Sequence, residues 1–318
     1  MQPTNPIGFG TAAIGRPQYI NIRQEAVAFE SLEAFRQKGL EVLETAYQLG
    51  IRYFDTAPGY GMAEQLLIDW LRGKEDETIE VATKWGYTYT ANFDPNAETH
   101  EVKEHSLSKL NEQWRQSQLL LPFLSTYQIH SATFETGVLE NQSVLQRLAD
   151  LRTQHQLKIG LTTSGANHLD VLQRAMEVEV NGEFLFEVFQ VTYNVFDQSV
   201  APVAAQLAKE GRRLVIKEAL ANGRVFPNEK YQHYEAVYQL LGKLAAKYEV
   251  GMDAIALRFC VDSIPTYSVL SGAALSEHLA TNIQASRFEL SAAEIEKLRA
   301  FTIPTETYWS ERKRLGWN

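Results

Sequence analysis

Four polar residues that end predicted strands, or closely follow one, have side chains suited to moving a proton to or from an oxygen atom. Asp55 ends a short apolar run and Tyr60 follows it in the same turn, while Lys84 and His130 end two later runs. A tyrosine phenol has a reference pKa of about 10, and a nearby lysine ammonium favours the phenolate. An aspartate can hold that lysine in an ion pair, and a histidine can donate a hydrogen bond to a substrate oxygen as charge develops on it. The four residue types predict a proton relay and a cradle for a carbonyl oxygen.

Each of these side chains also has a plainer interpretation. An aspartate at a strand end often caps a helix, a tyrosine in a Pro-Gly turn can be a surface residue, and a single histidine is usually a satisfied core residue. Asp, Lys and His at strand ends also furnish metal-dependent hydrolase sites in barrels. The seven histidines include no His-x-His pair and strand-end carboxylates are few, so we predict no metal site.

The elements that must position these groups are short apolar runs alternating with segments of helical periodicity. Eight runs are typical of β-strands, at residues 7–11, 53–55, 79–84, 126–130, 158–162, 187–191, 214–217 and 267–270. Helical spacing covers residues 40–49, 64–71, 101–113, 138–155, 169–177, 200–209 and 231–260, the last holding at least two helices broken at Val250-Gly251. This alternation favours a (β/α)₈ TIM barrel over a doubly wound sheet. We expect one domain spanning residues 1–318, with a C-terminal tail from about residue 304.

Barrel geometry makes the strand ends informative, because active residues of TIM barrels lie at the carboxyl ends of the strands. Polar residues fall at or next to six of the predicted ends: Asp55, Lys84, His130, Thr162, Gln190 and Lys217. Chance would mix apolar residues among them, so we predict one shared site.

Composition limits the class of partner. The chain has 318 residues, 39 acidic and 30 basic, with a formal net charge of -9, which disfavours nucleic acid and favours a small-molecule partner. Its single cysteine, Cys260, excludes an intrachain disulfide and suits a reducing compartment, so a cytoplasmic location is expected. No signal-peptide pattern and no apolar run of about 20 residues occurs, which predicts no membrane association. A monomer is expected because no isolated apolar stripe is left over.

Four ordered motifs then identify a family resemblance. They are Gly50-x-Arg52-Tyr53-Phe54-Asp55-Thr56-Ala57, Tyr60-Gly61 with Glu64, Thr83-Lys84-Trp85, and Tyr127-Gln128-Ile129-His130. This set resembles the signature of the aldo-keto reductase superfamily, over a stretch from Gly8 to about Asn282. The resemblance implies a catalytic tetrad of Asp55, Tyr60, Lys84 and His130, with Tyr60 as general acid in reduction and general base in oxidation. It also implies metal-free hydride transfer between a nicotinamide and a carbonyl or alcohol carbon.

The same resemblance implies contacts with a nicotinamide cofactor at twelve positions: Gly10, Thr11, Thr162, Thr163, Gln190, Lys217, Leu220, Asn222, Leu270, Gly272, His278 and Asn282. Three of them depart from the family pattern. Thr162-Thr163 replaces a Ser-Asn pair, Lys217 replaces an aromatic ring, and His278 stands where an arginine often holds the 2′-phosphate. The resemblance favours NADP(H), while His278 leaves NAD(H) open.

Substrate choice is expected in aromatic residues around the barrel mouth, namely Tyr19, Trp85, Tyr87 and Trp309. The Asp55-Thr-Ala-Pro-x-Tyr60-Gly form of the motif is similar to the aldose dehydrogenase branch, whose members oxidise sugars at C1. Aldehydes and ketones remain alternative substrates. A nucleotide-binding barrel that regulates a partner with little turnover is the alternative function, and turnover distinguishes the two.

Overall fold

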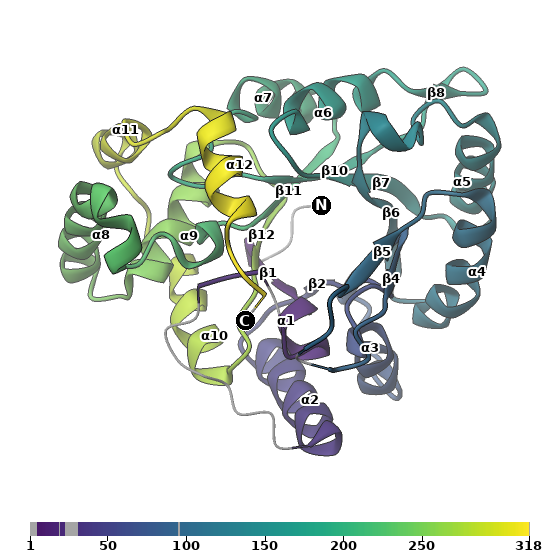
Figure 1. Ribbon diagram of the computed structural model, residues 1–318, viewed down its shortest axis with the longest axis horizontal. Helices are drawn as coiled ribbons and strands as arrows, with labels where there is room; N and C mark the ends of the chain where they lie inside the picture. The colour runs from purple at the N-terminus through teal and green to yellow at the C-terminus, as the bar shows by residue number, and fades with distance from the viewer. Residues whose placement is uncertain (1–4, 19, 23–30, 95, 318) are drawn as a thin grey trace.

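A closed parallel barrel forms the centre of the molecule (Figure 1). The structure is a computed structural model that describes residues 5–18, 20–22, 31–94 and 96–317. Within them, eight strands close the barrel in the order β1-β12-β11-β10-β7-β6-β3-β2, each paired in parallel with its neighbours. Their bounds are β1 Ile7–Gly10, β2 Tyr53–Asp55, β3 Glu80–Trp85, β6 Leu124–Ala132, β7 Lys158–Thr163, β10 Val188–Thr192, β11 Arg213–Lys217 and β12 Ser268–Ser271. The predicted TIM barrel is confirmed.

Side-chain alternation along the strands explains how the barrel presents its polar groups. Tyr53, Ala82, Val188 and Val215 belong to a small apolar cluster that is separate from the main core. Successive side chains of a strand point to opposite faces, so residues two positions further share the same face. Those residues are Asp55, Lys84, Gln190 and Lys217. Apolar residues therefore fill the barrel interior, and polar ones follow at its carboxyl end.

Helices surround the barrel and bury its outer face (Figure 1). Their bounds are α1 Ala12–Gly15, α2 Leu32–Gln48, α3 Ala63–Leu71, α4 Leu107–Ser117, α5 Gln142–His155, α6 His168–Met176, α7 Ala201–Lys209, α8 Glu235–Tyr248, α9 Met252–Ser263, α10 Ser276–Asn282, α11 Ala292–Arg299 and α12 Thr305–Lys313. The predicted break near Val250-Gly251 is confirmed, because α8 ends at Glu249 in the left-handed conformation (φ 54°). Among the described residues, no helix has the length and apolar character needed to cross a bilayer.

One predicted helix is partly wrong. The segment 101–113 begins as a strand: β5 (Glu101–Lys103) pairs antiparallel with β4 (Tyr87–Tyr89), and α4 starts only at Leu107. Ser106 sets that start, because its side chain accepts a hydrogen bond from the Lys109 backbone N–H at 3.1 Å. A second hairpin, β8 (Glu179–Val180) with β9 (Glu183–Phe184), was also not predicted.

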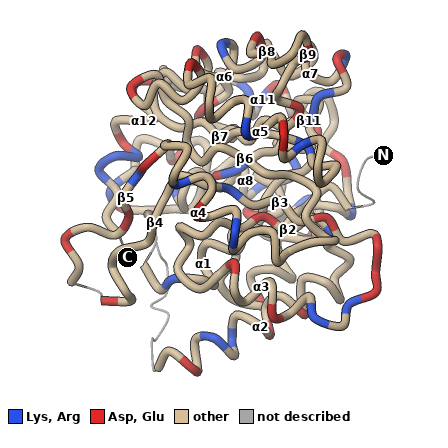
Figure 2. Tube along the Cα trace, turned by 90° about the vertical axis from the view of Figure 1, so that its right-hand side faces the viewer, with Lys and Arg blue, Asp and Glu red and all other residues tan. Residues whose placement is uncertain are grey.

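The end of the chain returns to the barrel. In α12, the Trp309 indole donates to Asp197 in the loop after β10, and Arg312 pairs with Glu218 in the loop after β11. Further on, Trp317 stacks on His100, with ring centroids 4.4 Å apart. Figure 2 shows acidic and basic residues interspersed along the helices and loops, consistent with the modest net charge of -9.

Candidate active site

The structure brings together the four residues expected to form the tetrad. Asp55 is the last residue of β2, Lys84 lies near the end of β3, and His130 lies near the end of β6. Tyr60 comes from the loop between β2 and α3. Three neighbouring strands of the barrel, β2, β3 and β6, thus deliver these groups to one end.

Asp55 and Lys84 form a buried ion pair. The Lys84 Nζ donates to Asp55 Oδ2 at 2.5 Å and to the Thr56 carbonyl at 3.0 Å. The Lys84 side chain is 0% exposed and the Asp55 side chain is 3% exposed, so the pair is shielded from water. Gln190 Nε2 donates to the other carboxylate oxygen, Asp55 Oδ1, at 2.7 Å. Both oxygens are therefore fixed, as a buried charge requires.

Tyr60 and His130 lie beside this pair. The Tyr60 hydroxyl is 3.3 Å from His130 Nε2, and Lys84 Nζ is 4.8 Å from the centre of the Tyr60 ring. The loop that carries Tyr60 packs closely on the end of α1. A Cβ on Gly15 would lie 2.1 Å from the Tyr60 carbonyl, and one on Gly61 would lie 2.3 Å from the Gly15 carbonyl. Two glycines thus allow the close approach that holds the phenol in place.

The electrostatics of the phenol differ from the sequence-based expectation. Burial raises the pKa of Tyr60 well above its usual value, and the Asp55 carboxylate raises that pKa further. The Lys84 charge was expected to lower this pKa, but the Asp55 partner largely neutralises it. Burial, with the nearby Lys84 ammonium, also lowers the pKa of His130 well below its usual value. Before any ligand binds, the site thus holds a protonated phenol and a neutral imidazole.

A second ion pair flanks the phenol and was missed at the sequence level. Arg16 Nη1 pairs with Glu101 Oε2 at 2.7 Å and donates to the Gly59 carbonyl at 3.1 Å. The guanidinium carbon lies 5.4 Å from the centre of the Tyr60 ring. Arg16 follows α1 and Glu101 begins β5, so their approach depends on a hairpin that the sequence pattern did not reveal.

Lys217 lies at the end of β11 and is bound by hydroxyls. Its Nζ donates to Thr192 Oγ1 at 2.9 Å and to Ser164 Oγ at 3.1 Å. Burial lowers the pKa of Lys217 to about 8. The neighbouring Glu218 forms its ion pair with Arg312.

Four further residues with expected cofactor contacts lie inside the barrel. Thr162 Oγ1 accepts from the Ser131 backbone N–H at 2.8 Å, and Thr11 Oγ1 donates to the Asp55 carbonyl at 3.0 Å. Gly10 pairs with Asp55 in the barrel register. Thr163 is fully buried, and its hydroxyl has no hydrogen-bond partner in the part of the chain that is described.

Residues expected near the cofactor phosphates fall into exposed and buried groups. Gly272 and His278 are exposed, and no atom lies within 4 Å of the Cβ that a side chain at Gly272 would add. Asn282 is buried, where its amide donates to Asp253 and its oxygen accepts from Ser271. Leu270 belongs to the apolar cluster inside the barrel.

Two more of the residues with expected cofactor contacts follow β11. Leu220 is half-buried and packs against the main core. Asn222 has a left-handed backbone (φ 56°), and its amide donates to the Ile20 carbonyl at 3.0 Å. The β11 loop is therefore joined to the segment after α1.

The residues expected to contact the substrate also differ in how far they are buried. Tyr87 is half-buried and its ring lies 4.7 Å from that of His130. Trp309 lies 5.8 Å from Lys217 Nζ. Trp85 has no exposed surface and packs on His105 in the core, so the structure gives it no access to a substrate. Tyr19 lies outside the described residues.

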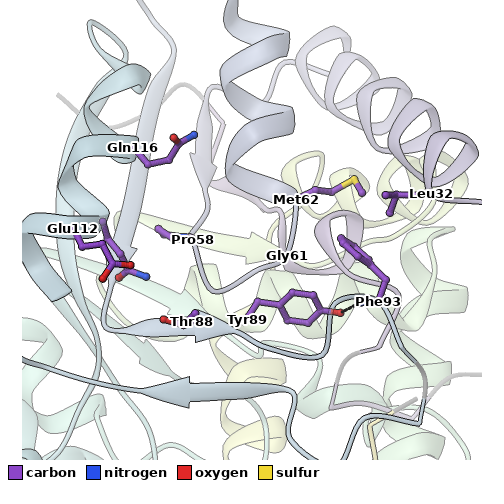
Figure 3. A pocket seen from close by; sticks show the side chains of 10 residues that line it. Leu32, Pro58, Gly61, Met62, Thr88, Tyr89, Phe93, Glu112 and Gln116 are labelled. Atoms are coloured by element: carbon purple, nitrogen blue, oxygen red, sulfur yellow. Dashed lines mark hydrogen bonds between the residues drawn. The ribbon is translucent and has the colours of Figure 1, made fainter.

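A separate hollow of about 460 Å³ opens behind the Tyr60 loop (Figure 3). Pro58, Gly61 and Met62 line one side and Tyr89 and Phe93 another, where Tyr89 Oη accepts from the Phe93 backbone N–H. None of the four tetrad side chains lines it. The hollow is thus distinct from the reacting groups. In the described residues, no three His, Cys, Asp or Glu side chains form a group that could hold a metal ion.

Comparisons of the sequence and of the fold with known proteins agree on one family. The model of the Aldo/keto reductase family matches residues 6–303. The chain is 22% identical over 295 residues to an NADH-specific methylglyoxal reductase of Escherichia coli, covering 83% of this chain and 87% of the relative. A D-threo-aldose 1-dehydrogenase of Pseudomonas is 25% identical over 296 residues, covering 83% and 88%. The fold matches a glycerol dehydrogenase of Gluconobacter oxydans with a TM-score of 0.70, 18% identity, and coverage of 94% and 92%.

Proposed function

Because the chain belongs to the aldo/keto reductase family, we propose that Tyr60 is the general acid and base with which it interconverts a carbonyl compound and its alcohol. The observation that carries this proposal is the 3.3 Å approach of the Tyr60 hydroxyl to His130 Nε2, beside the buried Asp55–Lys84 pair. A carbonyl oxygen placed between the phenol and the imidazole would receive a proton from one and a hydrogen bond from the other.

The protonation states suit the reductive direction. Tyr60 is protonated at neutral pH, because the usual tyrosine pKa of about 10 already lies above pH 7 and burial raises the pKa of Tyr60 further, so it can donate its proton to the oxygen as charge develops there. His130 is neutral because burial lowers its pKa, so it can orient the oxygen by a hydrogen bond without competing for the proton. In oxidation Tyr60 takes the proton back from the alcohol.

The residues present fit a nicotinamide cofactor. Thr163 offers a buried hydroxyl without a partner among the described residues, and Gly272 leaves open space on an exposed rim. We propose that Thr163 holds the cofactor near the tetrad, and that Gly272 and His278 hold its phosphate end. When bound, this group would supply or accept the hydride. We propose that NADP(H) is preferred and NAD(H) accepted, as the NADH-specific relative supports.

The substrate proposal rests on the mouth residues. The Tyr87 ring lies 4.7 Å from that of His130, and the largely buried Trp309 ring lies 5.8 Å from Lys217 Nζ; aromatic rings beside polar groups suit sugars and aryl aldehydes. We propose that the substrates are small aldehydes or ketones, with oxidation of an aldose at C1 as the reverse-direction reaction. The similarity to a D-threo-aldose 1-dehydrogenase supports the sugar.

Replacing the phenol tests the proposal. In Tyr60→Phe, we expect kcat for carbonyl reduction to fall at least about 10²-fold, because the proton donor is lost while the ring remains. The measurement is nicotinamide absorbance during turnover of a panel of aldehydes, ketones and aldoses. Tyr248→Phe is the matched control, since its hydroxyl bonds Glu294 on the outer helices, and it should retain activity. Undiminished reduction by Tyr60→Phe would refute the role of Tyr60.

A further inference from the structure

Several cations at the barrel mouth are paired with carboxylates, but Lys217 is not. Three ion pairs lie around the tetrad at N–O distances of 2.5 to 2.7 Å: Arg16 with Glu101, Lys84 with Asp55, and Arg312 with Glu218. Each of these pairs is locally neutral. Lys217, by contrast, has no carboxylate oxygen within 4.0 Å in the described part of the chain.

The contacts of Lys217 suit a side chain that binds a ligand better than one held in a structural ion pair. Its ammonium has three N–H donors, and two of them serve the hydroxyls of Ser164 and Thr192. The nearby Glu218 carboxylate raises the pKa of Lys217 but forms its ion pair with Arg312, so among the described residues no carboxylate contacts this half-buried ammonium directly. The remaining donor and the lack of a direct carboxylate partner point to an anionic ligand.

This charge faces the space where the carbonyl is proposed to react. The Ser164 hydroxyl, which binds Lys217, lies 3.5 Å from the Ser131 hydroxyl, and Ser131 directly follows His130. The Trp309 ring lies 5.8 Å from Lys217 Nζ and closes another side. Lys103 adds positive charge farther along this rim, where it donates to the Ser131 carbonyl.

We propose that Lys217 binds an acidic oxygen group, a carboxylate or a phosphate, carried by the carbonyl substrate. The inference rests on the proposed function, because it assumes that the carbonyl reacts at Tyr60. It narrows the substrate class to oxo acids or sugar acids and phosphorylated aldehydes. Ser164 and Thr192 act as positioning residues that aim the ammonium.

The ionisation of Lys217 gives the binding a pH dependence. Burial lowers its pKa to about 8, so the ammonium persists at pH 7 and is lost as the pH rises through that value. The charged groups that face it are Glu218, Arg312, Lys84 and Asp197. The preference for an acidic substrate should therefore decline above about pH 8.

A pair of substrates that differ only in the acid tests the proposal. The ratio of kcat/KM for 4-oxobutanoate to that for butanal should fall at least about tenfold in Lys217→Met, equivalent to about 1.4 kcal/mol. Lys217→Arg should keep part of the preference. Lys158→Met is the matched control, since Lys158 starts β7 at the opposite end of the barrel and pairs with Glu187. Its ratio should equal that of the unmodified protein.

Binding without turnover separates this inference from the role of Tyr60. Succinate should raise the melting temperature of the native chain and of Tyr60→Phe, but not that of Lys217→Met. An unchanged substrate ratio in Lys217→Met would overturn the inference. A loss of affinity in Lys217→Met that is confined to the cofactor, measured by fluorescence titration, would also overturn the inference. The anion that Lys217 binds would then be the cofactor diphosphate. Loss of turnover in Tyr60→Phe with its succinate response intact would leave both proposals standing.

Discussion

At the scale of single residues, the reacting phenol is balanced between opposing charges. Arg16 lies 5.4 Å from the Tyr60 ring and lowers the pKa of Tyr60, while Asp55 and Glu101 raise it. Burial is the largest influence, and it also raises that pKa. Besides burial, the ionisation of this side chain is thus influenced by Arg16, Asp55 and Glu101, which come from three separate segments.

Removing the positive partner and removing the negative partner of the Arg16–Glu101 ion pair should move the pH profile of kcat/KM in opposite directions. In the oxidative direction, activity requires the Tyr60 phenolate, so a lower pKa extends activity to lower pH. Arg16→Met should shift the rising limb of kcat/KM to higher pH, and Glu101→Gln should shift it to lower pH. Both variants break the same 2.7 Å ion pair, so lost structure alone would shift both profiles alike. Shifts in the same direction would contradict the electrostatic account.

At the scale of elements, the sequence pattern predicted the barrel better than the segments that decorate it. The run 53–55 matches β2 in both bounds, and all three of its residues are buried, as is typical of a parallel strand covered on both faces. By contrast, Glu101–Lys103 has a polar composition that helical spacing fits equally well, and its strand depends on pairing with β4. Lys84 and His130 could be placed because strand ends are visible in sequence. Arg16 could not, because its contact with Glu101 spans 85 positions and needs that hairpin.

Ion pairs tie the helix α12 to residues that follow β11, among them Arg224 with Glu311 and Arg312 with Glu218. Arg312 pairs with Glu218 with side-chain exposures of 19% and 6%, and its guanidinium lies 5.3 Å from the Trp309 ring. Although burial opposes ionisation, the charges of Arg312 and Lys217 hold the pKa of Glu218 well below its usual range. The last helix is therefore tied to the loop that follows β11, next to the proposed acid-binding group.

Removing one partner of this pair should destabilise the fold. Arg312→Met leaves Glu218 without its main counter-charge, and we expect the free energy of unfolding at pH 7 to fall by about 3–5 kcal/mol. Because the folded-state pKa of Glu218 is lowered, the pair contributes its full stability above the usual glutamate pKa and loses it as pH falls. The difference between variant and native protein in urea titrations should thus stay constant from pH 7 to about pH 5 and shrink as the pH falls below the usual glutamate pKa of about 4.3.

Two further variants complete this test. Adding Glu218→Gln to Arg312→Met should recover part of the lost stability, because the buried charge is then gone. Arg174→Met removes an ion pair with Glu140 whose side chains are 41% and 53% exposed, so it should cost less than about 1 kcal/mol. If Arg312→Met and Arg174→Met lower the free energy of unfolding equally, then burial does not increase the contribution of the Glu218 pair to stability.

At the scale of the whole molecule, the barrel places the residues proposed for proton transfer and those proposed for ligand recognition on different arcs. β2, β3 and β6 carry or precede the tetrad residues on one arc, and β7, β10, β11, β12 and β1 carry most of the expected cofactor contacts on the other. The tetrad arc keeps every residue of the family motif. The other arc departs at Thr163, Lys217 and His278, so the differences between this chain and its relatives concentrate in ligand choice. A monomer stays a prediction.

Cofactor discrimination follows from the charge of the whole molecule and of that second arc. A 2′-phosphate adds negative charge to a ligand approaching a protein of net charge -9, and the exposed His278 carries fewer hydrogen-bond donors than an arginine would. Arginine would instead provide a fixed fork of donors. We therefore expect the ratio of kcat/KM for NADPH to that for NADH to lie below about a hundredfold, or about 2.7 kcal/mol. His278→Arg should raise that ratio, and His233→Arg, whose imidazole faces Glu311 on α12, is the matched control. A native preference for NADPH above a hundredfold would contradict this expectation.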